Sequence, residues 1–237
     1  MELVSAKDGR RTPVVLFATP CFEKAVSLEY HSSMMATLIE CSRQGIAMGE
    51  HHVAGLQFVE IARNQIVHYF LTSDEGFTDL FFIDSDEGWD PKVIPRFLAY
   101  PHGVVCGLYP QKCDPPKFHD SALTGKIDVH GLFESREAPT GFMRVRREVF
   151  ERMDAEFPEL HAQVGTPFGW THTPYFQRGP TKYGVIGEDI FFSRQLEAMG
   201  ESIWIDSDVD FKHRGSQCWS GNFYDHCVQN GLLRKSA

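Results

Sequence analysis

The sequence predicts a single α/β domain in which a mostly parallel central sheet is flanked by helices. Leu80–Ile83 is apolar on both faces, as in a central strand that helices cover on each side. Elsewhere, short β-rich segments alternate with segments whose apolar residues recur at helical spacing. The chain has 237 residues, 42% of them hydrophobic, which is enough for one domain with a substantial core. We expect residues 1–13 to form an N-terminal extension and residues 14–237 to form this domain.

The first half of the chain predicts strands and helices in alternation. Val14–Ala18 is rich in residues that favour strands. The next apolar residues recur at helical spacing and predict a helix: Ala25, Leu28, Met35, Leu38 and Ile39. Gly45 ends this helix, and a second strand is expected between residues 45 and 55. A second helix is expected at 56–71, and a third begins at Asp90-Pro91, where a cap precedes a first-turn proline.

The second half predicts further strands and helices, separated by two long loops. Strands are expected at 103–109 and 140–145, with a strand pair or one bent strand at 202–213. Helices are expected at 147–153, 187–200 and 220–233. Residues 110–131 and 156–182 show neither period, so we interpret both as loops and the first as a lid. Aromatic residues of the second loop either stack against a sugar or cover the core: Phe168, Trp170, Tyr175 and Phe176.

Composition argues against several classes of protein. The net charge is −9, with 23 basic and 32 acidic residues and no long basic run, so nucleic acid is not an expected partner. No run of about 18 apolar residues occurs and the N-terminus lacks a signal-peptide pattern, so we expect a cytoplasmic protein without a transmembrane segment. The six cysteines show no Cys-x-x-Cys pair and no zinc-ligand spacing, and we assign them no chemistry.

The central strand ends in acidic residues. Side chains alternate along a strand, so Asp84 and Asp86 point the same way if the extended path continues past Ile83. Ligands of open α/β sheets bind beyond the carboxyl ends of the strands, where these residues lie. Two converging carboxylates favour a divalent cation, and hard oxygen ligands favour Mg²⁺ or Mn²⁺. The alternative is that the acids merely cap the next helix.

Three other positions are candidates for contact with a bound nucleotide. Thr19 and Pro20 follow the first strand, where a base or ribose could bind, although a plain turn is an equal explanation. Arg63 on the second helix either reaches a pyrophosphate or pairs with Glu60 on the surface. Lys112 in the first long loop is either an anion contact or a solvated lysine.

Two further features complete the set of candidates. Glu188 and Asp189 open a helix, a position that the helix dipole alone favours for acids. His213 ends the last predicted strand and is, on its own, either a core or an edge histidine.

The order of these features resembles nucleotide-sugar glycosyltransferases of the GT-A fold, especially the family 2-like enzymes. Asp84-Ser85-Asp86 is similar to their Asp-x-Asp motif, Glu188-Asp189 to their x-Glu-Asp motif, and His213 to a C-terminal metal-binding histidine. Ala62-Arg63-Asn64 resembles the Ala-Arg-Asn of the helix before the acidic strand. The resemblance covers residues 14–215 and implies a Rossmann-like sheet.

The resemblance also implies roles for these residues. Asp84 and Asp86 would hold Mn²⁺ or Mg²⁺ on a nucleotide-diphosphate sugar donor, with His213 completing the metal shell, and Ser85 would contact the donor. Asp189, beside Glu188, would be the general base that activates a hydroxyl of a carbohydrate or glycan acceptor. A single base without a second nucleophilic carboxylate implies inversion. Glu50 is the one candidate for gripping a uracil.

Two alternative functions are retained. A sugar-1-phosphate nucleotidyltransferase would also use acidic metal ligands, but residues 18–23 do not form the glycine-rich phosphate loop that it normally carries. The absence of G-x-G-x-x-G likewise disfavours a nucleotide-linked dehydrogenase. A non-catalytic carbohydrate-binding module on the same scaffold is the second alternative, because a fold alone does not fix an activity.

Overall fold

The computed structural model describes residues 12–120, 122–165, 171–181 and 184–233. Its centre is an eight-stranded sheet in which β8 and β7 run opposite to the other strands. In spatial order the strands are β2 (Ala47–Ala54), β1 (Val14–Cys21), β3 (Asp79–Ile83), β8 (Phe142–Arg146), β5 (Val104–Gly107), β11 (Ile203–Asp206), β7 (Phe133–Ser135) and β6 (Leu123–Ile127). The predicted α/β class with a mostly parallel sheet is therefore confirmed.

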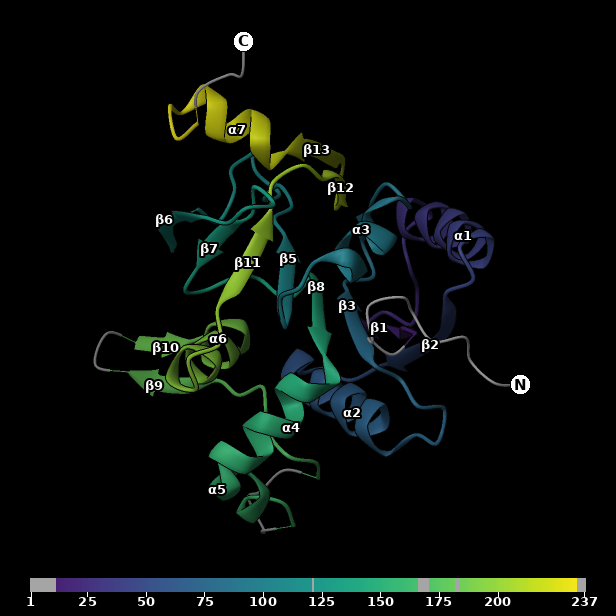
Figure 1. Cartoon of the computed structure of the whole chain (residues 1–237), viewed down its shortest axis with the longest axis vertical. Coiled ribbons are helices and arrows are strands. Elements are labelled where there is room, and N and C mark those ends of the chain that lie inside the picture. The colour runs from purple at the N-terminus through teal and green to yellow at the C-terminus, as the bar shows by residue number, and fades with distance from the viewer. Residues whose placement is uncertain (1–11, 121, 166–170, 182–183, 234–237) are drawn as a thin grey trace.

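Helices cover both faces of this sheet (Figure 1). On one face lie α1 (Leu28–Arg43) and α3 (Val93–Ala99), and on the other α2 (Val59–Thr72), α4 (Arg147–Glu156) and α6 (Glu188–Ala198). Strand β3 shows the division, because Phe81 and Ile83 pack with α1 and α3 while Leu80 and Phe82 pack with the other three helices. All four side chains are fully buried, as the apolar run predicted.

Smaller elements surround the sheet. A second, three-stranded sheet has the order β13 (Cys218–Asn222), β12 (Asp210–Arg214) and β4 (Glu87–Gly88). The others are α5 (Pro158–Ala162), the hairpin of β9 (Gly179–Thr181) and β10 (Gly184–Ile186), and α7 (Phe223–Gln229). None of the helices in the described part of the chain is long and apolar enough to cross a membrane. The small sheet joins the segment after β3 to the segment after β11, and so brings distant parts of the sequence together.

The buried face of α1 differs from the predicted one. Leu28, Met35 and Ile39 are exposed, and the helix instead buries Tyr30, Met34, Thr37 and Cys41. The hydroxyl groups of Tyr30 and Thr19 lie 2.7 Å apart in a buried hydrogen bond. The helix carries two stripes with apolar residues, and contact with β1 selects the stripe that contains Tyr30.

Three segments contain more regular structure than the sequence predicted. Strand β6 lies within the predicted loop 110–131, α5 and β9 lie within 156–182, and β13 occupies the start of the predicted helix 220–233. Strand β6 is an edge strand with mostly exposed side chains, so it has no apolar alternation to detect. Tyr175 and Phe176 are buried and cover the core, whereas Phe168 and Trp170 lie outside the described residues.

Candidate active site

A buried arginine joins two of the predicted acidic motifs. Arg63 on α2 is 4% exposed, its Nη2 lies 3.2 Å from Asp84 Oδ1, and its Nη1 donates to Glu188 Oε1. Burial lowers the pKa of Arg63, but the carboxylates of Asp84 and Glu188 outweigh it and the pKa is raised. We call these three residues the arginine cluster. The predicted alternative of an Arg63–Glu60 pair is wrong, because Glu60 Oε2 instead lies 3.3 Å from Arg178 Nε.

A glycine allows the arginine cluster to sit against the sheet. The Asp84 amide donates to the Gly141 carbonyl at 2.8 Å. A Cβ on Gly141 would lie 2.6 Å from Asp84 Oδ2 and would collide with the hydroxyl of Tyr109. The close approach that Gly141 permits is therefore made by two side chains of the protein itself.

The chain turns immediately after β3. The Glu87 amide donates to the Asp84 carbonyl at 3.2 Å, and residues 87–88 then form β4. The extended path assumed for Asp84 and Asp86 thus ends at Ile83, and the two carboxylates contact different partners. The Ser85 carbonyl accepts from the Ser27 amide at 2.8 Å, which fixes the turn to the start of α1.

A second cluster forms where β4 pairs with β12. Glu87 lies opposite His213 in the antiparallel register, and Asp86 precedes Glu87. His213 Nε2 lies 3.3 Å from Glu87 Oε1 and 3.7 Å from Asp86 Oδ2. One ligand atom from each of these residues falls within 4.8 Å of the others, an arrangement that could hold a metal ion. We call Asp86, Glu87 and His213 the histidine cluster.

The hydrogen bonds of His213 leave one nitrogen lone pair inside this cluster. A carbonyl oxygen only accepts, so the Pro110 carbonyl at 2.7 Å receives the proton of His213 Nδ1. Burial lowers the pKa of His213, which favours the neutral ring. Nε2 then presents a lone pair to Asp86 and Glu87. A metal-binding histidine is held in this way, with the other ring nitrogen bonded to a carbonyl.

Glu87 is buried in the histidine cluster without a hydrogen-bond partner from the described ranges. Its side chain is 0% exposed, and neither carboxylate oxygen has a hydrogen-bond partner among the described residues. Burial, followed by the charges of Asp84 and Asp86, raises the pKa of Glu87 well above its usual value. A divalent cation would satisfy these oxygens, and two carboxylates with an imidazole suit Mn²⁺. No local sequence pattern singles out Glu87, because its burial depends on the pairing of β4 with β12.

The remaining predicted residues lie at the same edge of the sheet with different surroundings. Strand β1 extends to Cys21, so Thr19 and Pro20 belong to the strand and not to the predicted loop. The Thr19 side chain is fully buried and is hydrogen-bonded to Tyr30, and Pro20 is half-buried. Lys112 Nζ contacts Asp86 Oδ2. Contact of Thr19, Pro20 or Lys112 with a nucleotide stays a prediction.

Asp189 differs from its neighbour Glu188. Both begin α6, but the arginine cluster takes up Glu188, whereas no ion pair joins Asp189 to another residue of the described ranges. Asp189 Oδ1 accepts from the Ile190 amide at 2.8 Å. Burial, followed by the charge of Glu188, raises the pKa of Asp189.

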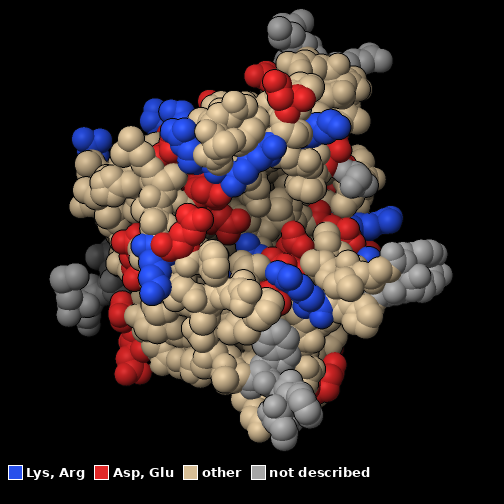
Figure 2. All heavy atoms as spheres, turned by 180° about the vertical axis from the view of Figure 1, so that it is seen from behind, with Lys and Arg blue, Asp and Glu red and all other residues tan. Residues whose placement is uncertain are grey.

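On the face opposite to that of Figure 1, acidic side chains gather in the middle and are bordered by Lys and Arg (Figure 2).

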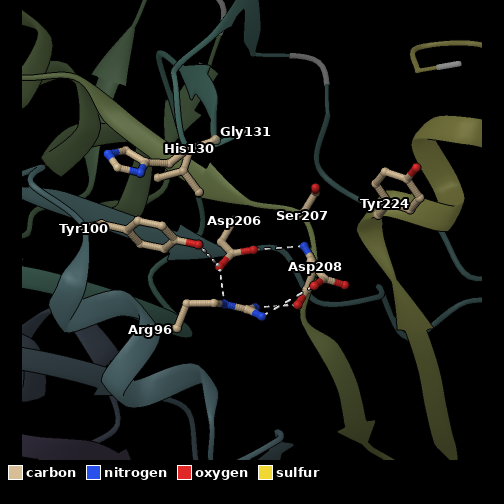
Figure 3. Close-up of a pocket in the computed structure, with 9 residues that line it drawn as sticks. Arg96, Tyr100, His130, Gly131, Asp206, Ser207, Asp208 and Tyr224 are labelled. Atoms are coloured by element: carbon tan, nitrogen blue, oxygen red, sulfur yellow. Dashed lines mark hydrogen bonds and ion pairs between the residues drawn. The ribbon is translucent and has the colours of Figure 1, made fainter. Parts of the chain in front are cut away.

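A separate cavity of about 420 Å³ lies between α3, the end of β11 and α7, and no predicted site residue lines it (Figure 3). Arg96 Nε lies 2.8 Å from Asp206 Oδ2, and the Tyr100 hydroxyl donates to the same oxygen at 3.0 Å. The other Asp206 oxygen accepts from the Asp208 amide at 2.9 Å. Both oxygens of Asp206 have partners, so this network connects α3 to β11 within the protein.

Comparisons with known proteins add evidence on the fold. No family model and no curated protein matches the chain. Among solved structures, A197 from STIV has a TM-score of 0.50 at 17% identity, over 85% of this chain and 86% of that one. The catalytic domain of Drosophila beta1,4galactosyltransferase 7 has a TM-score of 0.46 at 15% sequence identity. The match covers 81% of this chain and 64% of that one. The 4-diphosphocytidyl-2C-methyl-D-erythritol synthase of Anaerococcus prevotii has a TM-score of 0.42 at 8% sequence identity. The match covers 94% of this chain and 100% of that one. Likeness at these identities concerns the fold alone, and A197 from STIV shares the α/β fold of this chain over most of its length.

Proposed function

We propose that this protein is a metal-dependent glycosyltransferase. It would move a sugar from a nucleotide-diphosphate donor to a hydroxyl of a carbohydrate or glycan acceptor, with inversion. The proposal draws on the order of the motifs and on their meeting at one edge of the sheet, beyond the carboxyl end of β3. The observation that carries it is the histidine cluster, in which a buried, unpartnered Glu87 and the lone pair of His213 converge.

The residues present fit a divalent cation. Asp86, Glu87 and His213 would hold Mn²⁺ or Mg²⁺, and Asp84 would stay bound to Arg63. When bound, the cation would offset the negative charge that develops on the departing diphosphate. The Pro110 carbonyl orients the His213 ring by accepting its Nδ1 proton.

The arginine cluster would position the reacting groups. Arg63 contacts Asp84 after β3 and Glu188 at the start of α6, so it fixes the distance between these two elements. Because Glu188 is held in this way, Asp189 is the acid of the pair that can act on a substrate. Neighbouring residues of a helix diverge by about 100°, so the two acids cannot face the same group.

Asp189 would act as the general base. Its raised pKa makes the carboxylate a stronger proton acceptor than an ordinary aspartate. It would take the proton of the acceptor hydroxyl as the oxygen attacks the anomeric carbon opposite the diphosphate. One displacement of this kind inverts the anomeric configuration.

Substitution of Asp189 tests the catalytic assignment. Asp189→Asn is expected to lower turnover by about 10²- to 10⁴-fold and to leave donor affinity unchanged, because the base acts on the acceptor. Glu197→Gln is the matched control, since Glu197 is an exposed acid on the same helix. Transfer rate, donor affinity by calorimetry and the product anomer by NMR are the measurements. A fully active Asp189→Asn enzyme, or a retained anomer, contradicts the assignment.

Product analysis separates the alternative functions. A panel of nucleotide sugars with Mn²⁺ and glycan acceptors should yield a nucleoside diphosphate and a glycosylated acceptor. A sugar-1-phosphate nucleotidyltransferase would instead release pyrophosphate from a nucleoside triphosphate. A binding module would retain the sugar and form neither product.

Glu87→Gln should weaken Mn²⁺ binding by about 10- to 100-fold, the loss typical of an altered metal site.

A further inference from the structure

Lys112 is held in place by an anchored loop beside the histidine cluster. The loop follows β5 and is closed by the Gln111 amide, which donates to the Lys117 carbonyl at 2.7 Å. Phe118 at its end is buried, with its ring 5.6 Å from that of Phe223 on α7. At the start of the loop, the Pro110 carbonyl accepts a hydrogen bond from His213 Nδ1. The loop that carries Lys112 therefore also orients the imidazole of the cluster.

Gly215 provides space for the Lys112 side chain. A Cβ on Gly215 would lie 3.1 Å from Lys112 Cδ and 2.8 Å from Trp219 Cζ3. The aliphatic part of Lys112 thus crosses the backbone at Gly215, next to the Trp219 ring. The lysine side chain is 35% exposed, and its ammonium group contacts Asp86 Oδ2.

Asp86 Oδ2 is also the oxygen that faces the interior of the histidine cluster. It is the atom that lies 3.7 Å from His213 Nε2. A divalent cation bound between these atoms would stand close to the ammonium, and like charges at such a separation repel strongly. Lysine has a long, flexible side chain and a compact charge, so it can leave without movement of the backbone.

We propose that Lys112 holds Asp86 in the metal-free protein and is displaced from it by the divalent cation that binds Asp86, Glu87 and His213. This inference rests on the metal site of the proposed function. In the metal-free state the ammonium offsets the repulsion between the adjacent carboxylates of Asp86 and Glu87. Once displaced, it remains beside the site as a positive charge for a phosphate oxygen of the donor. Lys112 is thus a positioning residue that links occupancy by the metal to binding of the diphosphate.

Direct metal binding tests the inference without any assay of activity. Calorimetric titration with Mn²⁺, in the absence of nucleotide, compares the wild type with Lys112→Met, Lys112→Arg and Lys117→Met. Removal of the competing ammonium should tighten Mn²⁺ binding by about twofold to fivefold, the range set by partly exposed ion pairs. Lys112→Arg keeps the charge and should bind as the wild type does. Lys117→Met removes a charge from an exposed position of the same loop and should also leave affinity unchanged.

A second measurement checks the metal-free state. In chelator, Lys112→Met should melt below the wild type, and Mn²⁺ should raise its melting temperature by more than it raises that of the wild type. Equal or weaker Mn²⁺ binding by Lys112→Met overturns the inference and leaves the proposed metal site standing. If the wild type binds no Mn²⁺, and Asp86→Asn behaves identically, both the inference and the metal-dependent function are overturned.

Discussion

Residues 84–87, which follow β3, contribute carboxylates to both the arginine cluster and the histidine cluster. The carboxylates of the two clusters have different partners. In the arginine cluster, the carboxylates of Asp84 and Glu188 share one buried guanidinium. In the histidine cluster, neither oxygen of Glu87 has a hydrogen-bond partner within the described part of the chain, and Asp86 contacts the partly exposed Lys112. One guanidinium contacts both carboxylates of the arginine cluster, whereas no Lys or Arg of the described residues contacts Glu87 in the histidine cluster.

This difference separates the residues that stabilise the site, in the arginine cluster, from the residues proposed to bind a cation, in the histidine cluster. A buried carboxylate without a hydrogen-bond partner is destabilising, and the proposed cation would supply the missing positive charge. A buried carboxylate with a guanidinium needs no ligand, and its removal should harm the fold first. Stability and metal binding should therefore respond oppositely in the two clusters.

The largest effect is expected from Arg63→Met. It leaves two carboxylates in the arginine cluster without their cation, so the free energy of unfolding should fall by about 3–5 kcal/mol. Urea denaturation gives this value. Arg43→Met is the control, because the Arg43 side chain is 73% exposed, and it should change stability by less than about 0.5 kcal/mol. Equal stability of the two variants would show that the arginine cluster contributes nothing to the fold.

A smaller loss is expected from Gly141→Ala. The added Cβ would meet Asp84 Oδ2 and the Tyr109 hydroxyl, so stability should fall by about 1–3 kcal/mol. Gly179→Ala is the control, since nothing lies within 4 Å of a Cβ at that position. Adding Tyr109→Phe to Gly141→Ala removes one colliding atom and should restore part of the loss. If the double variant is no more stable than Gly141→Ala, the crowding at Tyr109 is not the cause.

The smallest effect, and one of opposite sign, is expected from Glu87→Gln in chelator. Burial and the nearby Asp84 and Asp86 raise the folded-state pKa of Glu87, so the fold favours the protonated acid. Stability of the wild type is then lost as the pH rises from the unfolded-state pKa of about 4.3 through the raised pKa. Glu87→Gln should be more stable by roughly 1 kcal/mol at pH 8 and equal to the wild type below about pH 4.

Urea denaturation across this pH range, without metal, measures the difference. Asp90→Asn is a suitable control, because Asp90 is an exposed acid just beyond β4. A Glu87→Gln protein that is less stable than the wild type at pH 8 would mean that Glu87 is as well balanced as Asp84. The contrast between the clusters would then disappear.

The amino-acid sequence alone was enough to predict the class of fold and to place acidic residues at the carboxyl end of its central strand. The apolar run 80–83 was long enough to identify a central strand, because burial on both faces leaves a continuous hydrophobic signal. The helix that begins at Glu188 was visible in the same way, from the spacing of its apolar residues. Local periodicity sufficed wherever an element buries a whole face.

The division of the acidic residues between the two clusters depends on contacts between distant parts of the chain. The turn after Ile83 sends Asp84 to Arg63 and delivers Asp86 and Glu87 to His213, whereas the sequence suggested one shared face for the two aspartates. The burial of Glu87 depends on β12, more than a hundred residues away, and no local pattern records it. The sequence also could not choose between the two stripes of α1, because that choice depends on what β1 presents to the helix. Periodicity reports which residues share a side of an element, but the partner of each charge is set by pairing between segments that are distant along the chain.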